Sequence, residues 1–184
     1  YATVLNNLAG TYRLAGKYEE AADLFNESAL IYSTTIGKDN SYYCSILNNL
    51  ALVYQDMKEY GKAEEMLANA LKSSRTLKNS QMDVAITYSN LGALYLEMGD
   101  YERAEEDLRE SVDIYEQLDT NHQVHLASVY NSLGILYYKQ GKLEEAKAAY
   151  QQALELTLYH YGKNHEYEIL CRNIAAIEEA VQEA

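Results

Sequence analysis

Asparagine residues recur at regular intervals along the sequence, and their type and spacing suggest a shared chemical task. They lie immediately before Leu8, Leu50, Leu91, Leu133 and Ile174, which follow one another at intervals of 42, 41, 42 and 41 residues. The positions concerned are Asn6-Asn7, Asn48-Asn49, Ser89-Asn90, Asn131-Ser132 and Arg172-Asn173. A carboxamide offers donors and an acceptor, so it can pair with a peptide group without requiring a particular side chain. The chemistry predicted for this set is hydrogen bonding.

Residues that could catalyse a reaction or hold a metal are sparse and poorly grouped. His122 and His125 are three residues apart, and His160 and His165 flank a glycine, but two imidazoles alone do not complete a zinc shell. Cys44 falls in a column of alanines and Cys171 in a column of leucine and tyrosine, so both are expected to be buried packing residues. No phosphate-binding loop or nucleophile motif is present. The sequence therefore predicts no enzyme, no metal site and no cofactor.

Composition excludes several classes of protein. The chain of 184 residues has 15 Lys and Arg against 28 Asp and Glu, a formal charge of −13, which argues against binding to nucleic acid or to an anionic membrane. No uncharged stretch is long and apolar enough to span a bilayer. With no proline and 9 glycines, long helices are favoured. Two cysteines give no disulfide framework, which favours the cytoplasm, and the start at Tyr1 suggests a fragment of a longer protein.

The elements that must position the asparagines are helices arranged in a repeat. Several columns align in the register of the leucines, among them a tyrosine column and an alanine column: Tyr12, Tyr54, Tyr95, Tyr137; Ala21, Ala63, Ala104, Ala146. Apolar residues recur at helical spacing on both sides of a central break at Gly16, Lys58, Gly99 or Gly141, of which Lys58 makes the least ideal turn. The predicted first helices are 2–15, 42–57, 82–98 and 123–140. The predicted second helices are 18–35, 60–77, 101–118 and 143–160, and a ninth helix covers 166–182.

In each repeat, a Leu followed by Gly or Ala and then by Tyr precedes an Ala, a large apolar residue and a small residue. The second repeat shows it as Leu50, Ala51, Tyr54, Ala63, Leu67 and Ala70. This pattern resembles the tetratricopeptide repeat, and its long period is similar to that of the kinesin light chain subtype. The resemblance implies an all-α, right-handed superhelical solenoid of four helix pairs and a capping helix. It is expected to form one array with repeats at about 1–41, 42–81, 82–122 and 123–164 and a terminal helix at 165–184.

The resemblance also implies a site. The asparagine positions lie opposite the buried stripe of Leu8 and Tyr12, so stacked repeats form them into a row, which in this family lies in a concave groove that holds peptides. Tyr138 lies on the same side as an exposed aromatic residue. The predicted peptide-binding residues are Asn6, Asn7, Asn48, Asn49, Asn90, Asn131, Tyr138, Lys139, Arg172 and Asn173. The alternative for the asparagines is that they bridge neighbouring helices.

The predicted function is non-enzymatic recognition of a peptide or protein segment. The lysines of a carboxylate-binding groove are absent, because Thr3, Ser45, Ile86 and Ser128 occupy their positions. The groove is therefore expected to be neutral, with Arg13 offset by Asp56. A second possibility is a structural or spacer module that associates through the ends of the array. Because Glu178 stands in the tyrosine column of a helix without a partner helix after it, Glu178 and Glu179 are expected in solvent.

Overall fold

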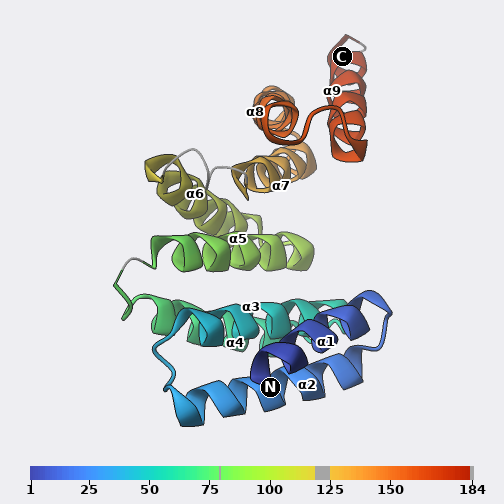
Figure 1. The fold of residues 1–184 in the computed structure, drawn as a ribbon. Coiled ribbons are helices and arrows are strands. Elements are labelled where there is room, and N and C mark those ends of the chain that lie inside the picture. The colour runs from blue at the N-terminus through green and yellow to red at the C-terminus, as the bar shows by residue number, and fades with distance from the viewer. Residues whose placement is uncertain (79, 119–124, 183–184) are drawn as a thin grey trace. The chain divides into compact units, whose positions relative to one another are not determined.

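Every regular element is an α-helix in the computed structural model, which describes residues 1–78, 80–118 and 125–182 (Figure 1). The chain divides into two compact units, Tyr1–Leu94 and Tyr95–Ala184, with the boundary inside α5. The predicted helices are all present in the described ranges. They are α1 (Ala2–Leu14), α2 (Tyr18–Thr35), α3 (Ser41–Asp56), α4 (Tyr60–Ser74), α5 (Gln81–Met98), α6 (Tyr101–Gln117), α7 (Leu126–Lys139), α8 (Leu143–Tyr161) and α9 (His165–Gln182). None of them has an apolar stretch long enough to cross a membrane.

The turns within the helix pairs have the predicted conformations, whereas the C-terminal end of α4 differs from the prediction. Gly16, Gly99 and Gly141 adopt positive φ angles of 74°, 81° and 73°, and Lys58 adopts the same left-handed conformation with φ of 62°, which is unfavourable for a residue with a Cβ. The prediction that α4 reaches residue 77 is wrong, because the helix ends at Ser74. There Ser74 donates to the carbonyl of Leu71 and Thr76 to that of Ser73, so hydroxyl groups compete with the helical backbone pattern.

Unit 1 is held together by small residues at the helix crossings and large ones between them. Ala9 and Ala21 are fully buried where α1 and α2 pack together, and Phe25, Ile46 and Val53 fill the space toward α3. Close packing of this kind needs residues with little volume at the points of contact. In unit 2 Gly134 has this role, since a Cβ there would lie 2.5 Å from the ring of Tyr150.

The buried stripe differs from the prediction at Leu8, which is 40 % exposed although Leu50, Leu91 and Leu133 are buried. Cys171 is a second correction: Cys44 is buried as predicted, but Cys171 is only half-buried, and both cysteines are unpaired.

The tyrosine column packs as predicted and carries a cation on each ring. The cations belong to the start of the second helix, and their distances from the ring centroids are 5.3 Å for Lys17–Tyr12, 5.2 Å for Lys62–Tyr54, 4.1 Å for Arg103–Tyr95 and 5.5 Å for Lys142–Tyr137. Glu178 holds the same position in α9. Glu178 and Glu179 are exposed as predicted, and Glu178 forms an ion pair of 2.7 Å with Lys147 of α8.

One acidic residue lies in an otherwise apolar column. Asp107 of α6 corresponds to Leu24, Met66 and Ala149 in the other second helices. Its side chain is half-buried, and burial raises its pKa to about 6, with a further contribution from the charge of Glu106. A carboxylate at this position therefore destabilises the fold at neutral pH.

Candidate functional site

A groove runs between α1 and α3 of unit 1 and contains three of the predicted binding residues. Its cavity of about 440 Å³ is lined by Asn6, Asn7, Gly10, Thr11, Arg13, Leu14, Phe25 and Asn49, and we call this set the asparagine groove. Gly10 leaves it open, since nothing lies within 4 Å of the position that a Cβ would take. The column of Gly10 holds Leu52, Ala93 and Ile135 in the other repeats, and this loss of a side chain was the signal in the sequence for a cavity.

The asparagine side chains form hydrogen bonds from helix to helix within unit 1. Asn49 Nδ2 donates to Asn6 Oδ1 at 3.4 Å, and Asn90 Nδ2 donates to Asn48 Oδ1 at 2.7 Å. In both pairs, the asparagine directly before the leucine of one repeat thus donates to the first asparagine of the repeat before it. The bridging alternative therefore describes a real set of contacts, but the two pairs differ in length and burial.

Asn48 is not a groove residue, which corrects the prediction. It is 5 % exposed, and its Nδ2 donates to the carbonyl of Cys44 and to Thr87 Oγ1, both at 3.0 Å, while its Oδ1 accepts from Asn90. All the polar atoms of its side chain are thus engaged inside the protein. Asn7, in contrast, is exposed, and Asn6 and Asn49 are half-buried at the groove.

The one charged residue in the lining of the asparagine groove, Arg13, is neutralised by an ion pair. Arg13 Nε donates to Asp56 Oδ2 at 2.6 Å, and each side chain is 30 % exposed. This is the compensation that the sequence predicted. The rest of the lining consists of amide groups, a hydroxyl, the exposed side chain of Leu14 and the buried ring of Phe25.

In unit 2 the predicted residues lie on α7 and α9. Asn131 is half-buried and donates to Glu166 Oε1 at 3.3 Å, while its own Oδ1 is buried and has no hydrogen-bond partner among the described residues. Asn173 is half-buried on α9, and Arg172 is exposed with its Nε directed at the carbonyl of Glu168, 3.4 Å away. Tyr138 is 53 % exposed and Lys139 is exposed, both at the end of α7.

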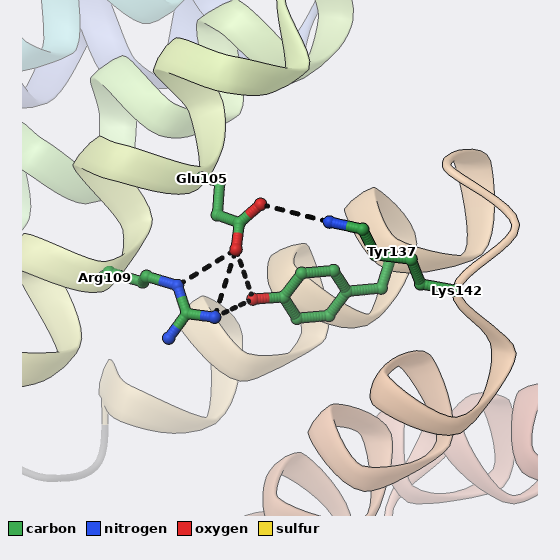
Figure 2. A network of polar contacts seen from close by, with 4 residues as sticks. All are labelled: Glu105, Arg109, Tyr137 and Lys142. Carbon is green, nitrogen blue, oxygen red and sulfur yellow. Dashed lines mark hydrogen bonds and ion pairs between the residues drawn. The ribbon is translucent and has the colours of Figure 1, made fainter.

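A polar network holds α6 to α7 and fixes the neighbour of Tyr138 (Figure 2). Arg109 Nη2 donates to the hydroxyl of Tyr137 at 2.7 Å, and that hydroxyl donates to Glu105 Oε1 at 3.1 Å. Lys142 Nζ lies 3.6 Å from the other carboxylate oxygen of Glu105. Burial raises the pKa of Glu105, but the hydrogen bonds from Arg109 and Tyr137 outweigh it, so the pKa is lowered. Tyr137 is thus an internal residue, whereas Tyr138 is exposed.

The described residues give no support for a metal site, since no three metal-ligating side chains among them come together. Of the histidines considered, His122 lies outside the described residues. His125 stacks on Tyr115 with ring centroids 6.0 Å apart, and His160 contacts the rings of Tyr159 and Tyr161.

Comparison with known proteins decides the family. The tetratricopeptide repeat family model matches residues 1–76 and 83–158, which together form most of the chain. The chain belongs to the tetratricopeptide repeat family. Domains of this family are typically protein-interaction modules and are generally not catalytic.

Solved tetratricopeptide repeat structures confirm the predicted fold class. A putative kinesin light chain from Podosopora anserina with nearly identical TPR-like repeats aligns with this chain with a TM-score of 0.75 and 21 % identity. The alignment covers 98 % of this chain and 87 % of that protein. BtubC (BKLC) from P. vanneervenii is matched over 89 % of this chain and 65 % of its own, with a TM-score of 0.76 and 23 % identity. The apo form of RapI gives a TM-score of 0.81 at 16 % identity, over 99 % of this chain and 64 % of its own.

A sequence relative is the mitochondrial tetratricopeptide repeat protein 19 homolog of Drosophila melanogaster, 34 % identical over 68 residues. The match covers 37 % of this chain and 18 % of that protein. The chain thus spans about a fifth of the length of this curated relative. The structural neighbours of the chain thus include kinesin light chain-like repeat arrays.

Proposed function

We propose that this tetratricopeptide repeat domain is a non-enzymatic module that binds a peptide or an extended protein segment, with the asparagine groove of unit 1 as its main binding surface. The observation that carries the proposal is the groove itself. It brings Asn6, Asn7 and Asn49 to one cavity beside a glycine that leaves the backbone of α1 accessible. Amide groups around an open, neutral cavity suit a peptide backbone, which needs donors and acceptors alike.

The hydrogen-bond geometry indicates which asparagines are free to exchange partners. The bond between Asn49 and Asn6 is long, at 3.4 Å, and both residues are only half-buried, so a peptide group can replace either side of it at little cost. Asn7 is exposed and borders the same cavity. The 2.7 Å bond between Asn90 and the buried Asn48 is a structural contact by comparison, so Asn90 contributes less to binding.

In unit 2, Tyr138 and Lys139 occupy the repeat positions that Arg13 and Leu14 have in unit 1, and both of those line the asparagine groove. Asn131 stands at the position of Asn6 by the same register. We therefore propose that Asn131, Tyr138, Lys139, Arg172 and Asn173 form a separate peptide-binding surface of unit 2. Tyr138 is its aromatic anchor, because exposed tyrosines are enriched among residues that dominate binding energy.

The test is a fluorescence polarisation titration with segments selected from a random peptide library. Asn7→Ala and Asn49→Ala should each weaken binding by about 1–3 kcal/mol, since a peptide group loses its partner. Asn26→Ala, an exposed asparagine of α2 outside the groove, is the matched control and should leave binding unchanged. Affinity should depend weakly on salt because the groove is neutral. Equal losses in Asn7→Ala, Asn49→Ala and Asn26→Ala, or no loss in any of them, would refute the groove.

A second candidate function is self-association through α1. Val4 and Leu8 are 65 % and 40 % exposed, although the equivalent Ile46 and Leu50 are buried. In a dimer formed through α1, the two copies cover these side chains against each other. Sedimentation velocity distinguishes this function: a dimer that Leu8→Glu dissociates supports it, and a monomer at all concentrations excludes it.

The cellular setting is part of the proposal. Cys44 and Cys171 are free thiols, as a reducing compartment such as the cytoplasm permits, and the excess of acidic residues disfavours nucleic acid and anionic membranes as partners.

A further inference from the structure

The junctions at which a second helix ends and the next helix begins differ along the chain in the two side chains that meet there. In unit 1, Tyr32 of α2 and Tyr42 of α3 stack with ring centroids 5.4 Å apart and planes at 12°, and the remaining cavity is about 30 Å³. Tyr115 of α6 and His125, next to α7, form the equivalent ring pair in unit 2. Aromatic pairs thus fill this position at two of the helix-pair ends.

At the end of α8 the ring pair is missing. Asn40 caps α3 by accepting from the N–H of Tyr43, and Asn164 accepts in the same way from Tyr167, which sets the register between α3 and α9. In this register Glu166 replaces Tyr42, and Thr157 replaces Tyr32 by the repeat of the second helices. The two shorter side chains leave a cavity of about 260 Å³. It is lined by His125, Ala127, Ser128, Thr157, Tyr161, Asn164 and Glu166, and we call it the α8–α9 pocket.

The size of the α8–α9 pocket suits one side chain. Sites for drug-sized ligands run from about 300 to 1,000 Å³, so this cavity is smaller than such a site. Thr157, although 2 % exposed, lines it, which shows that the pocket extends into the interior of the helix packing.

The walls of the pocket favour a positive charge. Glu166 contributes a carboxylate to the lining, and this carboxylate accepts a hydrogen bond of 3.3 Å from Asn131 Nδ2. The pocket lies at the C-terminal end of α8, where the helix dipole favours a cation, and the ring of Tyr161 adds an aromatic surface. The first turns of α7 and α9 would favour an anion, but Glu166 repels one.

We infer that the α8–α9 pocket accepts the cationic side chain, arginine or lysine, of a bound protein segment, with Glu166 as its counter-ion. This inference rests on the proposed function in one respect, since the bound protein segment is what supplies the cationic side chain. It adds a specificity determinant that the neutral asparagine groove lacks. The formal charge of −13 also draws a basic segment toward the domain.

The experiment is a nuclear magnetic resonance titration of the whole ¹⁵N-labelled chain with acetyl-arginine amide and acetyl-lysine amide. Acetyl-citrulline amide is the uncharged probe of the same shape as arginine. At least one cationic probe should shift the amide signals of Ser128, Thr157 and Glu166 in a saturable way, and citrulline should bind about tenfold more weakly. Glu166→Gln should weaken binding of the cationic probe by the same factor by which citrulline binds more weakly than arginine. Glu155→Gln, an exposed glutamate of α8 outside the pocket, should cause no such loss.

Three results would overturn the inference: equal binding of arginine and citrulline, equal losses in Glu166→Gln and Glu155→Gln, or tighter binding of the free diamine putrescine than of either amino-acid probe. Thr157→Tyr, which restores the residue of the first repeat, should close the pocket. Glu166→Gln provides the test independently if that variant does not fold. Asn49→Ala should leave probe binding unchanged, so a failure of the asparagine groove and a failure of the pocket are distinguishable.

Discussion

Replacing Asn48 by alanine should separate the structural asparagine from those that we assign to binding. Asn48 donates two hydrogen bonds of 3.0 Å, to the carbonyl of Cys44 and to Thr87 Oγ1, and accepts one of 2.7 Å from Asn90. In the variant, Thr87 keeps its hydrogen bond of 2.8 Å to the carbonyl of Asp83, whereas the side-chain amide of Asn90 loses its acceptor. A buried polar group left without a partner costs about 1–3 kcal/mol. We therefore expect Asn48→Ala to lower the free energy of unfolding by about 2–4 kcal/mol.

Urea unfolding followed by circular dichroism measures this loss, and thermal unfolding gives a second value. For a chain of this length each kcal/mol lowers Tm by about 2–4 °C, so the expected decrease is roughly 5–15 °C. Asn7→Ala is the matched control, because Asn7 is exposed, and its effect should stay within about 0.5 kcal/mol. If Asn48→Ala cost no more than Asn7→Ala, the assignment of Asn48 to the interior would be wrong.

Two further predictions concern stability. Lys58→Gly should raise the free energy of unfolding by about 0.5–1 kcal/mol in the same urea assay, because glycine adopts the φ of 62° without the strain of a Cβ; a loss of stability would contradict this. Asp107→Asn should stabilise the protein at pH 7 by on the order of 1 kcal/mol, since burial raises the pKa of Asp107 to about 6 and its charged form is disfavoured in the fold. That gain should vanish as the pH falls from 6 toward 4, where the folded protein binds a proton that the unfolded chain does not. A gain in stability that is the same at pH 7 and at pH 4 would show that the pKa of Asp107 is not raised in the fold.

The repeat columns predicted the helix pairs and turns because each depends on a local pattern. The alanine and tyrosine columns placed the helices, and the positive φ of Lys58 followed from its alignment with glycines. The exposure of Leu8 and Cys171 did not follow, since burial depends on how the helices pack around a position rather than on the residue type at that position. The end of α4 was missed because hydroxyl side chains, not a glycine, terminate it.

The candidate site was predictable as a set of positions but not residue by residue. Asn48 and Asn49 are adjacent and chemically identical, yet one is buried and the other borders the groove. A rotation of one residue along a helix decides between these environments, and the repeat pattern did not indicate which asparagine faced inward. The α8–α9 pocket had a readable signal, since Thr157 and Glu166 replace two tyrosines of the first repeat, but the space they leave becomes apparent only once the helices are packed.

The position of a bound peptide on unit 1 tests the central proposal most directly. The side-chain amide signals of asparagine are resolved in a ¹⁵N correlation spectrum, so a titration with a selected peptide reports on each carboxamide separately. We predict large shifts for Asn7, Asn49 and Asn6, and little change for the buried Asn48. Shifts confined to residues outside the asparagine groove, with the signals of Asn7 and Asn49 unmoved at saturation, would contradict the proposal.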